Sequence, residues 1–276
     1  MSLAPVQAFF LPAQYGGRLC LYHCPAHLPE DGAMESDCIL HIHAFAEEMN
    51  RSRRMAALTA RALAAQGCGV MQMDLFGCGD SAGDFGDARW EIWLDDIHVA
   101  LNWLRQRHRG KIHLWGDLVG ALLAMDFAAH HAGHAIDQLL LCQPILEGKS
   151  YLGRMNRLQL ARQMLNLQGQ SDLPTSSGTE YSGYKIAQEL ILSLEQKNAL
   201  NWRLPVRQVH CLEIADDNAM PAERSAFFGH WIESGNPVQL HFVDGPAFWQ
   251  TPETCQSQQW IDACCRIFQK ENCDSN

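Results

Sequence analysis

Short apolar runs alternate with longer segments of helical period along most of the chain. Runs of strand length lie at 37–43, 69–74, 111–115, 138–142, 206–214 and 238–243, and helical segments lie at 53–66, 90–107, 121–131 and 256–268. The chain opens differently, because residues 5–11 and 18–24 have the pattern of an antiparallel strand pair, with Gly16 and Gly17 as the turn. Alternation of this kind is typical of βαβ units, so the pattern predicts a mostly parallel sheet with helices on both faces.

The alternation is interrupted between residues 146 and 204. Two helical stretches, 153–168 and 185–198, flank the polar run QGQSDLPTSSGTE. We expect this segment to form a small helical cap. It would be inserted into a single compact domain made of residues 1–145 and 205–276.

Composition and charge restrict the classes of partner. The chain has 276 residues, of which 47% are apolar and 19% charged, and a formal net charge of −10, which repels phosphate backbones and anionic membranes. The N-terminus does not have the pattern of a signal peptide, and no apolar stretch approaches the roughly 20 residues that span a bilayer. We therefore expect a cytoplasmic protein without a transmembrane segment or a nucleic-acid partner.

The cysteines and histidines do not follow the spacing of a metal site. The chain has eleven cysteines, an odd number, and no C-x-x-C motif, so reduced, buried thiols are expected rather than disulfides or zinc ligands. His41 and His43 alternate along a predicted strand and are interpreted as core histidines. No metal or cofactor is predicted.

One glycine-bracketed turn carries the main functional signal. Residues 115–121 read WGDLVGA, which places Leu118 at the centre of a G-x-L-x-G sequence between a predicted strand and a predicted helix. In the G-x-S-x-G elbow of α/β-hydrolases the central residue is the nucleophile, and the next backbone N–H, here that of Val119, helps to bind an oxyanion. Leucine has no lone pair with which to attack a carbonyl, so ordinary serine-hydrolase chemistry is not expected.

Other segments match the remaining parts of a hydrolase site. Phe45 follows a strand at the place of the second oxyanion donor. Asp217, with Asp216 as its close competitor, stands at the place of the triad acid. Phe248, followed by Trp249, occupies the place of the histidine. The sequence therefore predicts a pocket lined by Phe45, Leu118, Val119, Phe248 and Trp249, in which two of the three triad residues are replaced.

Further motifs point to a particular family. They are FAEEMN at 45–50 with Arg53 and Arg54, DLFGCGDSAGDF at 74–85 with Trp90, Trp93, Asp95 and Asp96, Gln143-Pro144 with Gly148-Lys149, and GPAFWQ at 245–250. With these motifs the chain resembles the second α/β-hydrolase family associated with exosortase A systems. The resemblance implies an α/β-hydrolase fold and the label hydrolase. It also implies a partner in exopolysaccharide or protein-sorting machinery.

Several residues could supply chemistry in place of the missing serine. Glu47 or Glu48 could act as a general base beside the oxyanion site. An acid at a helix start is also explained without catalysis, because the positive N-terminal end of the helix dipole stabilises its charge. Arg53 and Arg54 near these acids are interpreted as a structural ion-pair network. Cys78 and Cys142 lie at strand ends and could be thiolate nucleophiles, although burial as small apolar side chains is favoured.

Two functions follow from the residues. The first is a non-catalytic α/β-hydrolase-fold protein that binds an acyl or ester-like small molecule or a protein partner. The second is an ester, thioester or acyl hydrolase in which Glu47 or Glu48 activates water. A pocket packed shut by apolar side chains would instead indicate a structural scaffold.

Overall fold

A computed structural model describes residues 5–26, 35–131, 133–166, 180–181, 183–215, 220–251 and 255–269. Its centre is an eight-stranded sheet with the strand order β1-β2-β4-β3-β5-β6-β9-β10. The strands are β1 (Val6–Ala13), β2 (Gly16–His23), β3 (Cys38–Ile42), β4 (Gly69–Met73), β5 (Ile112–Asp117), β6 (Gln138–Cys142), β9 (Gln208–Ile214) and β10 (Val238–Val243). β2 pairs antiparallel with β1 and β4, and the strands from β4 to β10 run parallel.

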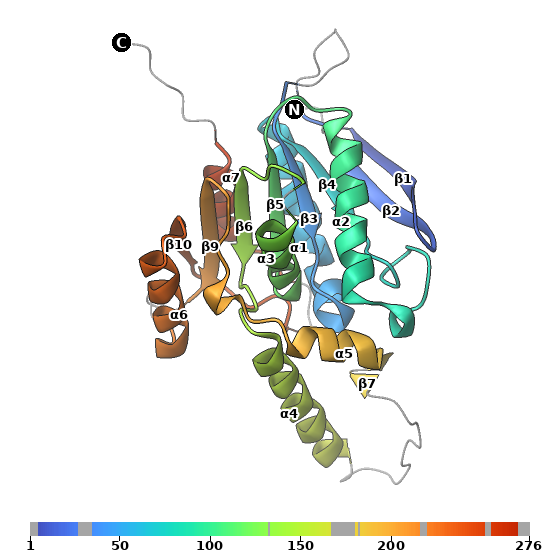
Figure 1. The fold of residues 1–276 in the computed structure, drawn as a ribbon, viewed down its shortest axis with the longest axis vertical. Coiled ribbons are helices and arrows are strands. Elements are labelled where there is room, and N and C mark those ends of the chain that lie inside the picture. The colour runs from blue at the N-terminus through green and yellow to red at the C-terminus, as the bar shows by residue number, and fades with distance from the viewer. Residues whose placement is uncertain are drawn as a thin grey trace.

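Helices cover both faces of the sheet (Figure 1). They are α1 (Ala46–Ala65), α2 (Trp90–Arg105), α3 (Val119–His130), α4 (Gly148–Asn166), α5 (Gln188–Glu195), α6 (Ala222–Glu233) and α7 (Gln258–Ile267), with the 3₁₀ turns η1 (Phe85–Asp87) and η2 (Ala199–Asn201). α1 and α7 pack together on one face, and α2 and α3 pack together on the other. This arrangement confirms the predicted α/β-hydrolase fold.

The segment after β6 leaves the layered body. α4 and α5 lie beyond the carboxyl ends of the parallel strands (Figure 1) and contact each other. A two-stranded hairpin of β7 (Glu180–Tyr181) and β8 (Tyr184–Lys185) accompanies them. Within the described part of the chain, no helix has the length and apolar character needed to cross a bilayer.

Several element boundaries differ from the sequence prediction; α4, for example, begins at Gly148 rather than at residue 153, and α5 spans only Gln188–Glu195. The first turn comes before Gly16, which opens β2, and Tyr15 takes the left-handed conformation with φ 65°. α1 begins at Ala46 rather than Arg53, because Met49 and Ser52 continue its buried face through a stretch of charged residues. β5 continues to Asp117, so the strand runs directly into the turn at Leu118.

A buried ion pair anchors the glycine-rich loop that follows β4. Arg18 on β2 is completely buried, and its Nε donates to Asp96 on α2 at 2.7 Å. The other carboxylate oxygen of Asp96 accepts from the N–H of Phe76 in the loop at 2.8 Å. Ser81 joins the same loop to β2, because its hydroxyl accepts from the N–H of Leu19 and donates to the carbonyl of Asp74. The serine hydroxyl therefore stabilises the loop.

The turn between β5 and α3 holds Leu118 in a strained conformation. Its φ and ψ are 53° and −115°, a region that side chains other than glycine rarely occupy. The close approach of the flanking elements requires both bracketing glycines. A Cβ on Gly116 would lie 2.5 Å from the Cα of Ala121, and a Cβ on Gly120 would overlap the carbonyl oxygens of Ile42 and His43.

We predict that Gly120→Ala lowers the free energy of unfolding by about 1–3 kcal/mol or more, because the new methyl group overlaps two carbonyl oxygens of β3 and the residue after it. Urea unfolding measures the change. Gly229→Ala is the matched control, since its Cβ on α6 meets nothing within 4 Å and alanine favours a helix over glycine. Equal stability of the two variants would contradict the close packing at the elbow.

Candidate functional site

The backbone of the elbow is bonded to the chain that leaves β6. The N–H of Leu118 donates to the carbonyl of Cys142 at 3.0 Å, and the N–H of Ile145 donates to the carbonyl of Leu118 at 3.1 Å. Val119 is the first residue of α3, so its N–H has no partner within the helix and is free of the helical hydrogen-bond ladder. The elbow thus has the backbone geometry of a nucleophile turn and carries an apolar side chain.

Aromatic rings cover the carboxyl ends of the strands beside the elbow. The ring of Phe45 lies 5.5 Å from Phe85, 6.0 Å from Trp93 and 5.7 Å from Tyr151 on α4, and Phe85 lies 6.0 Å from Tyr184. We call these five residues the aromatic cluster. The predicted pocket residues Phe45, Leu118, Val119, Phe248 and Trp249 are each at most 5% exposed. All five side chains therefore belong to the buried apolar core.

Phe248 lies in the turn that follows β10. Its ring stands edge-on to Trp249 at 4.9 Å and to Trp260 of α7 at 5.1 Å. The turn is joined to the start of α1, because Arg51 donates to the carbonyl of Gln250 at 2.7 Å. The position predicted for the catalytic histidine therefore belongs to an aromatic packing group that has no proton to exchange.

The acid predicted for the triad lies outside the described residues, as does its competitor, because Asp216 and Asp217 fall in the undescribed stretch 216–219. The described acid nearest to them in the chain is Glu213 near the end of β9. It is buried, accepts from Arg224 at 2.5 Å and from the amide of Gln143 at 2.8 Å, and burial raises its pKa. Glu213 was not among the site residues expected from the sequence, although its place near a strand end was a usable signal.

Glu47 and Glu48 have different surroundings at the start of α1. Glu47 is exposed over 40% of its side chain and pairs with Arg51 at 2.9 Å. Glu48 accepts from the hydroxyl of Tyr151 at 2.8 Å and lies 3.6 Å from Arg154. Burial raises the pKa of Glu48, and the contacts with Tyr151 and Arg154 oppose that rise. Of the two acids, Glu48 has the environment of a general base.

The arginine expected beside these acids lies elsewhere. Arg53 bonds both oxygens of Asp74, at 3.1 and 3.0 Å, rather than Glu47 or Glu48. Arg53 follows Glu48 by five residues and Glu47 by six. Only side chains three or four residues apart are neighbours on a helix surface, so Arg53 points away from both acids. Arg51 and Arg154 are the cations that pair with Glu47 and Glu48.

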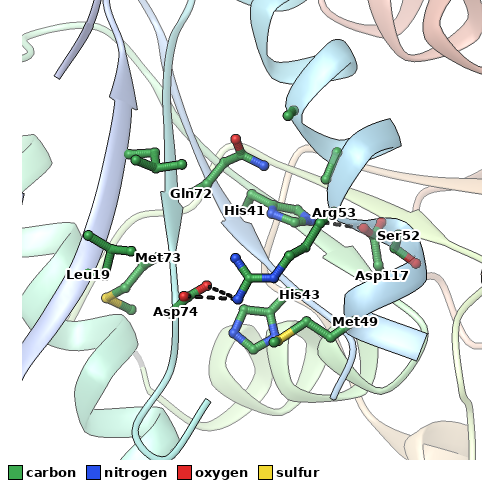
Figure 2. Close-up of a pocket in the computed structure, with 13 residues that line it drawn as sticks. Leu19, His41, His43, Met49, Ser52, Arg53, Gln72, Met73, Asp74 and Asp117 are labelled. Carbon is green, nitrogen blue, oxygen red and sulfur yellow. Dashed lines mark hydrogen bonds and ion pairs between the residues drawn. The ribbon is translucent and has the colours of Figure 1, made fainter. Parts of the chain in front are cut away.

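A cavity of about 200 Å³ lies on the face of the sheet that α1 covers (Figure 2). Its apolar lining residues are Leu19, Leu21, Met49, Ala56, Ala57 and Met73, and its polar lining residues are His41, His43, Ser52, Arg53, Gln72, Asp74 and Asp117. This cavity was not among the sites expected from the sequence. Its signal was the alternation of His41 and His43, which was interpreted as core packing.

His41 and Asp117 form a buried pair in this cavity. The Nε2 atom of His41 lies 2.9 Å from Asp117 (Figure 2). The other carboxylate oxygen of Asp117 accepts from the indole N–H of Trp115 at 2.7 Å. Trp115 and Asp117 share one face of β5, because residues two apart in a strand point to the same side. The residue before Leu118 therefore directs its carboxylate toward the face covered by α1.

The hydrogen bonds of His43 determine its tautomer. Its Nδ1–H donates to the carbonyl of Ala44, and its Nε2 accepts from the N–H of Leu75 at 3.0 Å. Because a backbone N–H can only donate, Nε2 carries no proton. Burial lowers the pKa of His43 to about 4, although Asp74 and the Ala44 bond act in the opposite direction.

Arg53 is the cation of the cavity. Its side chain extends from α1 to Asp74, which directly follows β4 (Figure 2). Asp74 also accepts from the N–H of Asp80, so the carboxylate is held by the glycine-rich loop as well. The guanidinium group thus joins α1 to that loop at the cavity wall.

The two cysteines considered as nucleophiles are buried thiols. Cys78 is 4% and Cys142 is 1% exposed. Burial and nearby carboxylates raise the pKa of Cys78, and burial together with Cys264 raises the pKa of Cys142. A raised pKa disfavours the thiolate, so their environment is that of packing residues.

We predict that His43 remains neutral, with its proton on Nδ1, as the pH falls from 6.5 toward 4. Histidine takes up a proton more readily in the unfolded chain over this range, so His43 makes the protein less stable as the pH falls. Ring ¹⁵N shifts recorded by NMR during an acid titration report both the charge of the His43 ring and the nitrogen that carries its proton. A proton on Nε2 of His43 at pH 6 would contradict the hydrogen-bond assignment.

Comparisons with known proteins agree with this architecture. A family model described as serine aminopeptidase, S33 (Hydrolase_4), matches residues 35–212, which is more than half of the chain. A search of curated proteins found no match.

Several solved structures have the same fold. Est1E from Butyrivibrio proteoclasticus with bound ferulic acid has a TM-score of 0.64 at 15% identity, over 94% of this chain and 97% of that chain. A putative hydrolase from Agrobacterium vitis S4 has a TM-score of 0.59 at 18% identity, over 95% and 97%. A carboxyl esterase from Bacillus coagulans in complex with glycerol has a TM-score of 0.59 at 15% identity, over 87% and 90%.

At such identities the structural likeness shows the fold alone, whereas the family model covers the strand–elbow–helix core in which Leu118 lies. The chain belongs to the Hydrolase_4 (serine aminopeptidase, S33) family of the α/β-hydrolase superfamily.

Proposed function

We propose that this protein is a non-classical α/β-hydrolase, a pseudoenzyme that binds a small acyl or ester-like molecule without forming an acyl-enzyme. The observation that carries the proposal is Leu118 at the centre of an otherwise complete elbow. Acyl transfer through this fold begins with attack by the side chain at that position. An isobutyl group cannot attack, and Phe248 cannot accept or return a proton.

The cavity on the α1 face supports a place for the ligand. The residues expected to line a pocket at the elbow are buried, whereas this cavity offers apolar walls together with hydrogen-bonding groups. Leu19, Leu21 and Met49 suit an acyl chain. Arg53 and His41 suit its carbonyl or ester oxygen, because each carries N–H groups.

The motifs named above also support a finer assignment. We propose that the protein is a member of the exosortase A-associated hydrolase 2 family and serves exopolysaccharide or protein-sorting machinery in the cytoplasm. The support is the combination of FAEEMN at 45–50, DLFGCGDSAGDF at 74–85 and GPAFWQ at 245–250. In this proposal Phe45 and Trp249 have packing roles rather than roles in catalysis.

We predict that a fluorophosphonate probe leaves the wild-type protein unmodified, because the elbow has no nucleophile. Intact-mass spectrometry before and after incubation measures the adduct. An active serine esterase treated in parallel verifies the probe. Stoichiometric modification at one serine of the wild-type chain would overturn the loss of the serine mechanism.

A second candidate function is hydrolysis by water that Glu48 activates. The observation in its favour is the raised pKa of Glu48, a half-buried carboxyl that accepts a hydrogen bond from Tyr151. Glu48 would take a proton from water as the water attacks an ester or thioester carbonyl. The N–H groups of Phe45 and Val119 would stabilise the resulting oxyanion.

The binding proposal predicts equal background rates for the wild type, Glu48→Gln and Glu47→Gln with a panel of aryl esters and thioesters. Glu47→Gln is the matched control, since Glu47 is the exposed neighbour at the same helix start. General-base catalysis typically contributes about 10²–10⁴-fold. A loss of that size confined to Glu48→Gln would favour the hydrolase instead.

A further inference from the structure

Polar side chains gather on one face of the sheet at the amino ends of four adjacent strands. Residues paired across parallel strands, and residues two apart within a strand, point to the same face. By this register the group comprises His113 on β5, Gln138 on β6, Gln208 and His210 on β9, and Gln239 and His241 on β10. Six polar residues in register are unusual on a sheet face that a helix covers.

These side chains line a groove of about 990 Å³ beside the end of α7. The helix contributes Ala263 and Arg266 to the groove, and Phe268 follows directly after the helix. The amino ends of these strands lie at the end of the sheet opposite α4 and α5 (Figure 1). The groove shares no lining residue with the cavity of Figure 2 and is separate from it and from the elbow.

Two buried imidazole nitrogens of groove residues have no hydrogen-bond partner among the residues that the structure describes. They are Nδ1 of His113 and Nε2 of His210. His113 is 3% exposed and His210 is 6% exposed. The carboxylates nearest to His113, those of Asp37 and Asp137, lie 3.9 and 3.8 Å away, beyond hydrogen-bond distance. Buried polar atoms are normally paired, so a ligand that pairs with these nitrogens would be favoured.

The other nitrogen of His210 is occupied. Nδ1 of His210 lies 3.0 Å from Nε2 of His241. If His241 donates in this bond, the proton of neutral His210 is on the buried Nε2, which is then an unpaired donor at the groove wall. Burial, with contributions from His241 and Arg207, lowers the pKa of His210 to about 4, so the ring is neutral near pH 7.

The charged groups around the groove leave an excess of positive charge. Lys111 and Arg207 share the carboxylate of Asp137, at 3.5 and 3.1 Å. Asp37 accepts from the backbone N–H of Lys111. Among the described residues, Arg266 has no carboxylate within ion-pair distance. Three cations thus face two carboxylates in a protein whose net charge is −10.

We propose that this groove binds the phosphate group of a small phosphate monoester. Arg207, Lys111 and Arg266 would neutralise the phosphate, and the ring N–H groups of His210 and His113 would donate to its oxygens. The groove exceeds the size of a phosphate ion, so it also has room for the attached organic group. The acidic protein as a whole repels long polyanions, which favours a small ligand over nucleic acid.

Isothermal titration calorimetry with phenyl phosphate and with inorganic phosphate tests the proposal. Both should bind to the wild type, and the Arg207→Gln/Arg266→Gln double variant should bind at least tenfold more weakly. Lys149→Gln is the control, because it removes an exposed cation at the start of α4, at the other end of the sheet. Benzoate tests whether a carboxylate substitutes for phosphate. Tighter binding of benzoate than of phenyl phosphate would overturn the assignment.

Ring ¹⁵N shifts of the wild type provide a test that needs no variant. Phenyl phosphate should shift the resonances of His113 and His210, whereas His130 on α3, across the sheet, should not change. The absence of heat at millimolar phosphate, or shifts confined to residues outside the groove, would overturn the proposal. Neither result depends on whether the elbow is catalytic, because the two sites lie at opposite ends of the sheet.

Discussion

The close passage of α3 across the carboxyl ends of β3 and β5 is the constraint on which the rest of the site depends. Gly116 and Gly120 permit this passage, because a side chain at either position would overlap the neighbouring backbone. The passage forces residue 118 into a left-handed conformation. A hydrolase uses that conformation to present its nucleophile. Here the residue in that conformation is leucine, and under the proposed function the strained turn serves no acyl-enzyme step.

Consecutive residues of the same turn have different surroundings, one apolar and one polar. Leu118 and Phe45 are buried in the apolar core, whereas Asp117 turns its carboxylate toward His41 under α1. Bonds of His43 to Ala44 and Leu75 then connect this polar side to the loop that would hold an oxyanion. A ligand beneath α1 would contact the residues that support the elbow without requiring any covalent step.

The sequence was sufficient for the fold and for the position of the elbow, because periodicity and glycine spacing are local signals. It was insufficient for the start of α1, where charged residues conceal the buried face marked by Met49. Contacts between side chains that are far apart in the sequence could not be predicted from it. The bond of Arg53 to Asp74 and that of Tyr151 to Glu48 join segments 21 and 103 residues apart, and no spacing rule reports such contacts. The roles of Glu47, Glu48 and Asp217 stay predictions.

NMR and mass spectrometry of the wild-type protein with methyl butyrate test the central claim most directly. The account predicts that the ester shifts the ring resonances of His41 and His43, which line the cavity under α1. It also predicts that the ester is recovered intact and that the protein mass is unchanged. A butyryl adduct on the protein, or release of butyrate at an enzymatic rate with no shift at His41 or His43, would contradict it.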